Sequence, residues 1–384
     1  MRANLKKTVS ALFLLAFSAV FGPSAFEAGK YSIGPSESCA ATREARREIT
    51  DSVGRKVTLP DEINRVVISS IWPLPSVYCL FEGSAKKLVG IHPASMSAAQ
   101  NSMLARVTPD ILKASTGFTK GNDINMEELL KLRPDVVFYA PASEGETDAE
   151  YEQFKAAGIP AVAFSTFTWN FDCVKTFENW VKLLGEVLQR QDEAAGIAAY
   201  GHEAYENIQK TFAANPGMKK PKVLILFEYK DGFITTSGSN FFGQYWIESS
   251  GGINVASGLS GMPEINMEQV YQWDPDIIFI TNFSPALPED LLENKIEGHD
   301  WRGVSAVKNG KVYKFPLGMY RWFPPSSDTP LALKWLAQKT HPDLFPDMDM
   351  EKEVLDYYER FYKVKLTDDD LYKIFHPARE ASQL

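Results

Sequence analysis

One motif occurs twice in this chain and limits what it can fold into. The segment INMEELLKLRPDVVFYA begins at Ile124, and INMEQVYQWDPDIIFIT begins at Ile265. In each copy an Asn, a favoured helix N-cap, is followed three residues later by Glu or Gln, which is the pattern of a capping box. A proline then ends the helix, because the residue before proline disfavours the helical conformation. Each copy therefore predicts a short capped helix that leads into a buried strand.

Two copies of one helix–strand unit predict two lobes of similar architecture. Short apolar runs alternate with helical patterns around both copies, at residues 65–70, 87–93, 135–140 and 161–165 in the first half and at 222–229, 232–238, 276–281 and 311–315 in the second. Strands that alternate with helices are typical of parallel sheets. The predicted fold class is α/β, with two Rossmann-like lobes, each built on a central parallel sheet, and a ligand cleft between them.

The segment between the two lobes has a helical pattern. Its apolar residues recur at gaps of three and four, as on one face of a helix, at Val174, Phe177, Val181, Leu184 and Leu188. The helical composition continues to about Ala214, with Gly196 and Gly201 as candidate interruptions. We therefore predict one long α-helix that joins the lobes. Two amphipathic helices near 350–363 and 367–376 are expected to finish the chain.

The N-terminus has the pattern of a secretory signal peptide. Arg2, Lys6 and Lys7 precede an apolar run of 13 residues, VSALFLLAFSAVF, and small residues follow to Ala28. That run is shorter than the about 20 apolar residues that a membrane-spanning helix needs. The predicted division is a signal peptide 1–28, a flexible segment 29–47, an N-terminal lobe 48–170, a connecting helix 171–215, a C-terminal lobe 216–345 and a helical extension 346–384. The expected location is the periplasm.

Charge and cysteine content exclude some classes of protein. The net charge of −9 leaves no basic face for nucleic acid. The three cysteines, Cys39, Cys79 and Cys173, allow one disulfide, and the sequence leaves its pairing open. The five histidines are scattered, so no metal site is predicted.

The chain has no Gly-x-Ser-x-Gly, phosphate-loop or dinucleotide-binding motif, so we predict a binder that is not an enzyme. An exported hydrolase is the alternative from another class.

The order of these parts resembles the periplasmic substrate-binding proteins of ABC importers for metal chelates. The resemblance is carried by the signal peptide, by ITDSVGRKVTLP followed by RVV, by INMEELLKLRPDVVFY, and by the connecting helix with a second α/β lobe; it covers roughly residues 48 to 345. Members of that family bind ferric siderophores, haem or cobalamin between two rigidly joined lobes. The resemblance implies a monomer without a cofactor that works with an inner-membrane permease.

Glu127 and Glu268 occupy equivalent positions in the two copies of the motif. Each lies in the first turn of its predicted helix, where the helix dipole already favours a carboxylate. In a cobalamin-binding member of the family, the glutamate of this motif in each lobe docks onto arginines of the permease. The resemblance therefore assigns Glu127 and Glu268 to permease docking. A sensor that binds a chelate without a permease is the alternative.

The ligand is expected beyond the carboxyl ends of the strands, where ligands of open α/β sheets bind. Aromatic residues dominate these positions and suit an organic chelate; a role in closing the core is the alternative for each. The predicted ligand contacts are Trp72, His92, Phe118, Tyr139, Trp169, Tyr229, Asn240, Asn282, Tyr320, Arg321 and Trp322. Since Arg321, Tyr320 and His92 suit anionic oxygen-rich ligands, a ferric siderophore is the first choice. A corrinoid, haem, a nickel or cobalt chelate and an oxyanion are the alternatives.

Overall fold

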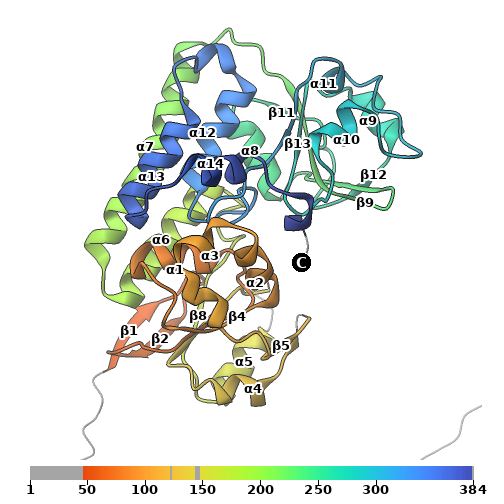
Figure 1. Cartoon of the computed structure of the whole chain (residues 1–384). Helices are drawn as coiled ribbons and strands as arrows, with labels where there is room; N and C mark the ends of the chain where they lie inside the picture. Colours follow the sequence, from red (N-terminus) through yellow and green to blue (C-terminus); the bar gives the residue numbers. More distant parts are fainter. Residues whose placement is uncertain (1–45, 122, 143–147, 383–384) are drawn as a thin grey trace, which may run out of the picture. The chain divides into compact units, whose positions relative to one another are not determined.

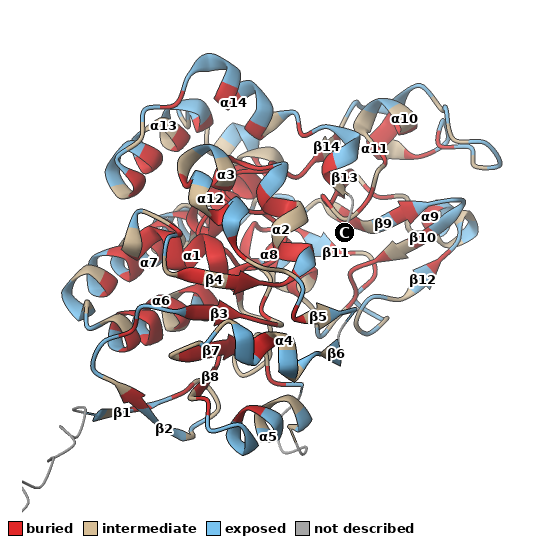
Figure 2. Ribbon diagram, turned by 60° about the horizontal axis from the view of Figure 1, so that its bottom comes forward, coloured by how far each residue is buried: buried red, intermediate tan, exposed pale blue. Residues whose placement is uncertain are grey.

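The first lobe is built on a four-stranded sheet in which every pair of strands is parallel. The computed structural model describes residues 46–121, 123–142 and 148–382, so the predicted signal peptide and Cys39 lie outside the described residues. The sheet has the order β4-β3-β7-β8. Its strands are β3 (Val66–Ile68), β4 (Leu88–Ile91), β7 (Val136–Tyr139) and β8 (Ala161–Ala163). Figure 2 shows that these strands are buried, whereas α4 and α5 expose much of their surface.

Short helices and hairpins complete the first lobe (Figure 1). The hairpin of β1 (Arg46–Thr50) and β2 (Lys56–Pro60) precedes the sheet. The helices are α1 (Leu74–Glu82), α2 (Pro93–Gln100), α3 (Met103–Val107), α4 (Met126–Lys131) and α5 (Ala149–Ala156), with a 3₁₀ turn at Pro109–Lys113 and a small hairpin of β5 (Thr119–Lys120) and β6 (Asp123–Ile124). Strands therefore alternate with helices, as the sequence predicted.

The second lobe contains a mixed sheet of order β12-β10-β9-β13-β14, with β11 beside β9. Its strands are β9 (Lys222–Lys230), β10 (Phe233–Thr236), β11 (Ile253–Asn254), β12 (Glu264–Ile265), β13 (Ile277–Ile280) and β14 (Val312–Lys314). Strands β9, β11, β13 and β14 pair in parallel, but β10 pairs antiparallel with β9 and β12. The cause is the two-residue turn Asp231-Gly232, where both residues have positive φ, as a tight hairpin turn requires. This edge departs from the parallel arrangement predicted.

Helices pack around this second sheet. They are α8 (Phe242–Ser249), α9 (Met267–Trp273), α10 (Pro288–Leu292), α11 (Ser305–Lys308) and α12 (Thr329–Thr340). Trp335 of α12 contacts the rings of Phe279 and Phe315 on one face of the sheet. With two lobes, each formed by a sheet and its helices, the predicted fold class is confirmed.

The repeated motif forms equivalent structures in both lobes. Asn125 caps α4 and Asn266 caps α9, each through its side-chain oxygen. Only α9 has the full capping box, because Gln269 returns a bond to the backbone of Asn266. The capping box predicted for α4 is wrong: Glu128 forms an ion pair with Lys131 instead, 2.6 Å away.

The Asp that follows each proline joins neighbouring strands. The Asp135 carboxylate accepts hydrogen bonds from the backbone N–H groups of Asn64 and Arg65, and the Asp135 N–H donates to the Arg65 carbonyl. Asp276 makes the same exchange with Lys222. Each copy of the motif thus aligns the strand that follows it with the first strand of its own sheet, β7 with β3 and β13 with β9. The duplicated sequence therefore corresponds to a duplicated way of building a sheet.

The segment between the lobes is a hairpin of two helices, so the prediction of one long helix is wrong. Helix α6 (Cys173–Leu188) ends at Gln189, which has a left-handed conformation, and α7 (Gln191–Ala214) begins two residues later. A Cβ on Gly185 would meet Ala194, and one on Gly201 would meet Phe177, so the two helices are antiparallel. The chain reverses because Arg190 donates its N–H back to the Gly185 carbonyl. Gly196 and Gly201 lie inside α7 and do not interrupt it.

The C-terminal residues contact both lobes. They form a 3₁₀ turn at Pro342–Leu344, α13 (Met350–Tyr362), α14 (Asp368–Phe375) and a last 3₁₀ turn at Arg379–Ser382. Asp370 of α14 lies 3.5 Å from Arg106 of α3, and Glu353 of α13 lies 2.7 Å from Lys334 of α12. In the described part of the chain, Cys79 and Cys173 are buried free thiols, and no helix is long and apolar enough to cross a membrane.

Candidate ligand-binding cleft

A cavity of about 440 Å³ is lined by residues of both lobes. The first lobe contributes the segment after β3, together with Ala140 after β7 and Thr166 after β8. The second lobe contributes the end of β9, the start of α8, Phe283 after β13 and the segment 320–325. The cavity therefore lies at the carboxyl ends of strands from both sheets, where open α/β folds bind their ligands. We call it the cleft.

Aromatic rings form most of the wall of the cleft. The rings of Phe227 and Phe283 are stacked with centroids 5.0 Å apart, and Phe241 contacts Phe227, Phe242 and Phe323. The full aromatic set is Trp72, Phe171, Trp180, Phe227, Phe241, Phe242, Phe283, Tyr320 and Phe323. Such rings offer a large, rigid contact surface at low conformational-entropy cost.

A bulge in β9 turns two residues toward the cleft. Glu228 pairs with Thr235 and Leu226 pairs with Thr236, so Phe227 is the extra residue between two consecutive pairs. Leu224, Leu226 and Tyr229 consequently face one core cluster, while Phe227 packs against the other. Bulges often re-aim side chains next to functional sites. This one brings Phe227 and Glu228 into the wall of the cleft.

Few polar groups reach the cleft. The Ser70 hydroxyl donates to Glu150, 2.8 Å away, and accepts from the Ala140 N–H. Ser69 donates to the other oxygen of the Glu150 carboxylate, whose pKa burial raises above its ordinary value. The Tyr320 hydroxyl is buried, and the Arg321 guanidinium lies 5.8 Å from the centroid of the Tyr320 ring.

Two of the residues predicted to contact a ligand, Trp72 and Tyr320, line the cleft. His92 lies behind Trp72, with its ring stacked on the indole at 5.1 Å, and its Nδ1 caps α2 by accepting from the Ala94 N–H. Trp169 is half-buried in the turn after β8 and does not line the cavity. Of these four predicted residues, Trp72 and Tyr320 therefore line the cavity, whereas His92 and Trp169 do not.

Several other predicted residues are held within the lobes themselves. Tyr139 is buried at the end of β7, and its hydroxyl bonds to Arg55 and Asp148. Phe118 packs in the same core cluster of the first lobe. Tyr229 is buried on the other face of the second sheet, where its hydroxyl contacts His299 and Trp301.

The last four predicted residues lie near the cleft but outside its wall. Asn240 is exposed in a left-handed turn, and the Asn282 side chain donates to the Phe315 carbonyl at 2.8 Å. Trp322 is buried against Trp335 and Phe375. Arg321 is fully buried; its guanidinium lies over the Phe283 ring at 4.8 Å and donates to the Ala381 carbonyl.

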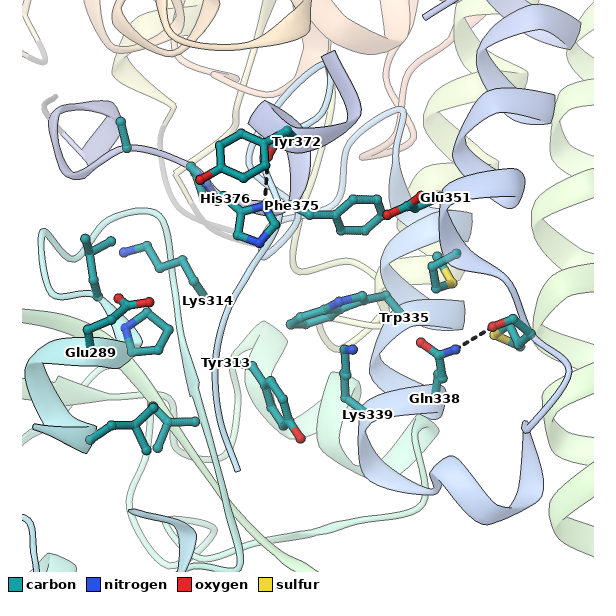
Figure 3. A pocket seen from close by; sticks show the side chains of 18 of the residues that line it. Glu289, Tyr313, Lys314, Trp335, Gln338, Lys339, Glu351, Tyr372, Phe375 and His376 are labelled. Carbon is teal, nitrogen blue, oxygen red and sulfur yellow. Dashed lines mark hydrogen bonds between the residues drawn. The ribbon is translucent and has the colours of Figure 1, made fainter. Parts of the chain in front are cut away.

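A second cavity, of about 860 Å³, lies in the C-terminal half of the chain (Figure 3). All its lining residues follow position 286, so the first lobe contributes nothing to it. Lys314 contributes its stem, but its ammonium donates to the carbonyls of Ser284 and Ala286. Lys339 lies over the Tyr313 ring, 5.5 Å from its centroid. Because the second lobe and the C-terminal helices form this cavity without the first lobe, the cleft is the better candidate for a site that uses the duplicated fold.

No group of three or more His, Cys, Asp or Glu side chains is arranged to hold a metal ion in the described residues. The wall of the cleft is instead mostly aromatic. Two sheets that present an aromatic cavity between them define the architecture of a solute-binding protein.

The chain belongs to the family of periplasmic binding proteins. The family match covers residues 76–317, which is more than half of the chain. A solved periplasmic solute-binding protein from Veillonella parvula is 32% identical, with a TM-score of 0.77 over 86% of this chain and 97% of that one. The family consists of transport components that bind solutes.

Two relatives have names that state the solute they bind. The molybdate-binding protein MolA of Haemophilus influenzae is 27% identical over 85% of this chain and 93% of its own length; its molybdate-bound structure superposes with a TM-score of 0.68 and covers 84% of this chain and 99% of that one. The Fe(3+)-citrate-binding protein YfmC of Bacillus subtilis is 23% identical over 81% of this chain and 89% of its own length. These relatives bind different solutes, so similarity of fold alone does not identify the ligand of this chain.

Proposed function

We propose that this protein captures a metal chelate of the iron–siderophore type in the cleft and delivers it to the permease of an ABC transporter. The observation that carries the proposal is the aromatic cavity at the carboxyl ends of both sheets. We propose that Trp72 and Tyr320 contact the chelate together with the phenylalanine cluster. The protein acts in the periplasm as a monomer, without catalysis, after removal of the predicted signal peptide.

An oxyanion is the second candidate ligand. It is favoured by the 27% identity to a molybdate-binding protein over most of both chains. The Fe(3+)-citrate-binding relative favours an iron chelate instead. The two candidates differ in what they need from the cleft: a small dianion needs several hydrogen-bond donors or cations, whereas a chelate presents an organic shell.

Binding can be tested on the purified mature protein with ferric chelates. A chelate that binds only the folded state stabilises it by about 2.7 kcal/mol at a hundredfold excess over the dissociation constant. Trp72 and Trp180 line the cleft, so binding is also expected to change tryptophan fluorescence. Mass spectrometry with metal analysis of material co-purified from the native periplasm identifies the natural ligand. Turnover of an ester or phosphate substrate, abolished by one cleft substitution, would instead establish the hydrolase.

Glu127 and Glu268 are proposed as the docking residues for the permease. Both are exposed on the first turns of α4 and α9. Three residues further on, and so on the same helix surface, Leu130 and Tyr271 are 47% and 45% exposed. Each lobe therefore presents a carboxylate beside an exposed apolar side chain. A permease surface with two arginines flanked by apolar residues would complement these two matched patches.

The docking proposal is tested by Glu127→Ala combined with Glu268→Ala. The double variant is expected to bind ligand as the wild type does and to lose transport into cells that carry the cognate permease. The matched control is Glu62→Ala with Glu297→Ala, which removes one exposed carboxylate from each lobe elsewhere. Equal transport by the two double variants would rule out docking through Glu127 and Glu268 while leaving ligand capture intact.

A further inference from the structure

We infer that the cleft selects neutral or positively charged chelates with an apolar organic shell and discriminates against anionic ligands. This inference rests on the proposed function, because it names the chemical class that the same cleft accepts. It differs from the expectation based on Arg321, which favoured anionic oxygen-rich ligands.

The charge of the cleft wall is the first observation. Among the described residues that line the cavity, Glu228 alone has a formal charge, and none is Lys, Arg or His. The other side chains of the wall that carry a polar atom are Ser70, Thr166, Tyr320, Trp72 and Trp180, and the Trp180 indole N–H already donates to the Ser165 carbonyl. An anion that leaves water for such a wall loses its hydration without gaining a cation, which is costly unless it is paired. Moving a neutral ligand with an apolar shell from water to the same wall costs much less free energy.

The hydroxyl of Ser70 is already committed to a second carboxylate. Ser69 and Ser70 both donate to Glu150, so Ser70 has no further proton for a ligand. Its oxygen also accepts the Ala140 N–H. Each lobe therefore places a carboxylate in or directly behind the wall, Glu150 in the first and Glu228 in the second. The Glu228 carboxylate, which lies in the wall, opposes the entry of an anion, whereas burial raises the pKa of Glu150 and so weakens the negative charge behind the wall.

The nearest basic side chains face other partners. The Arg321 guanidinium lies over the ring of Phe283, donates to the Ala381 carbonyl and does not line the cavity. His92 is neutral, because its Nδ1 accepts a hydrogen bond from the Ala94 N–H and cannot carry a proton there. Its Nε2 lies 3.2 Å from the Gly121 carbonyl, and burial lowers its pKa. Neither group is presented to a ligand.

A series of probes that share one chelate tests the inference. Ferrioxamine B has a neutral tris-hydroxamate iron centre and a pendent ammonium; N-acetylation makes it neutral, and N-succinylation makes it negative. The three probes thus share the iron centre and differ in a pendent group whose charge runs from positive through neutral to negative. Isothermal titration of the purified protein is expected to show affinity that falls from the positive to the neutral to the negative probe, with about tenfold between the first and the last. Molybdate is expected not to compete.

Glu228→Gln isolates the contribution of the charged residue in the wall. The substitution keeps the shape of the side chain, and Glu228 is exposed on β9, so the fold is expected to be retained. The variant should bind the positive probe about threefold to fivefold more weakly and so reduce the preference for the positive over the neutral probe. The control is Glu264→Gln, an exposed carboxylate on β12 of the same lobe that does not line the cleft.

The outcomes separate this inference from the proposed function. If the negative probe or molybdate binds at least as tightly as the positive probe, the charge selectivity is refuted, while capture of a solute in the cleft stands. An unchanged affinity of Glu228→Gln for the positive probe would remove Glu228 from the explanation and refute its role. If none of the three chelates binds, both this inference and the metal-chelate proposal are overturned.

Discussion

Replacing Gly185 by Ala is expected to destabilise the hairpin of α6 and α7. A Cβ on Gly185 would lie 2.5 Å from the Cβ of Ala194 and 3.3 Å from the carbonyl oxygen of Arg190. Non-bonded carbon atoms are normally about 3.5–4.0 Å apart. Neither neighbouring atom is the end of a flexible side chain, so the backbones of α6 and α7 must separate by about 1 Å at their closest approach. The substitution therefore forces α6 and α7 apart at this contact.

The magnitude follows from two opposing contributions. Overpacking a tight site costs about 1–3 kcal/mol, and this overlap belongs at the upper end of that range. Exchanging Gly for Ala inside a helix contributes about 0.8–1.0 kcal/mol in the stabilising direction. We expect Gly185→Ala to lower the free energy of unfolding by about 1–2 kcal/mol. Gly196 is the matched control: it is an exposed position of α7, and its Cβ would meet nothing within 4 Å.

Gly196→Ala should therefore stabilise the protein by about 0.5–1 kcal/mol, the opposite sign. Both variants can be compared with the wild type by urea unfolding, followed by tryptophan fluorescence and far-ultraviolet circular dichroism. The slope against urea must stay constant for the comparison to measure stability. A Gly185→Ala variant at least as stable as the wild type would refute the close approach of α6 and α7 at this residue.

Two further predictions concern the repeated motif and a buried acid. Gln269→Ala removes the reciprocal bond of the capping box in α9 and should cost about 0.5–1.5 kcal/mol of stability, whereas Glu128→Ala in α4 removes only an exposed ion pair and should cost less; equal losses in urea unfolding would contradict the difference between the caps. Burial raises the pKa of Asp328 to about 7, above its usual 3.8, so the folded state holds a proton that the unfolded state releases between these values. The wild type should therefore lose stability relative to Asp328→Asn as pH rises from about 4 to about 7, and parallel pH profiles of the two proteins would disprove this account.

The duplicated motif was the most informative part of the sequence for the fold. Its Asn, Pro and Asp act through local hydrogen bonds and backbone conformation, so both copies were predicted to form a capped helix followed by a strand, and both do. The failures came where local patterns have two solutions. A helical pattern from Val174 to Ala214 fits one long helix or two packed ones, and the left-handed Gln189 that separates them has no strong sequence signal. The antiparallel pairing of β10 was missed for a different reason: the Asp231-Gly232 turn is a recognisable hairpin signal, and the prediction of a parallel sheet did not use it.

The candidate site was located by segment more accurately than by residue. Asn240, Asn282 and Trp322 were predicted, yet the cleft is lined by Phe241, Phe283 and Phe323, the next residue in each case. Similarly, Tyr229 was predicted and Glu228 lines the cleft. Adjacent residues of extended chain point in opposite directions, so the position of a segment at a strand end does not say which neighbour faces the ligand. The bulge at Phe227 shows how one extra residue changes that choice.

The sequence by itself determined the two matched α/β units, because caps, prolines and apolar runs act over a few residues and need no distant partner. The tertiary structure alone decided which side chains share the cleft. Phe171 after the first lobe, Phe227 of a bulged strand and Phe283 after β13 are brought to one wall from segments far apart in the chain. It also decided that Arg321 is buried behind that wall and away from the ligand surface. Such placements depend on how two sheets and a helical hairpin pack together, and that packing is a sum of many weak contacts that no short stretch of sequence contains.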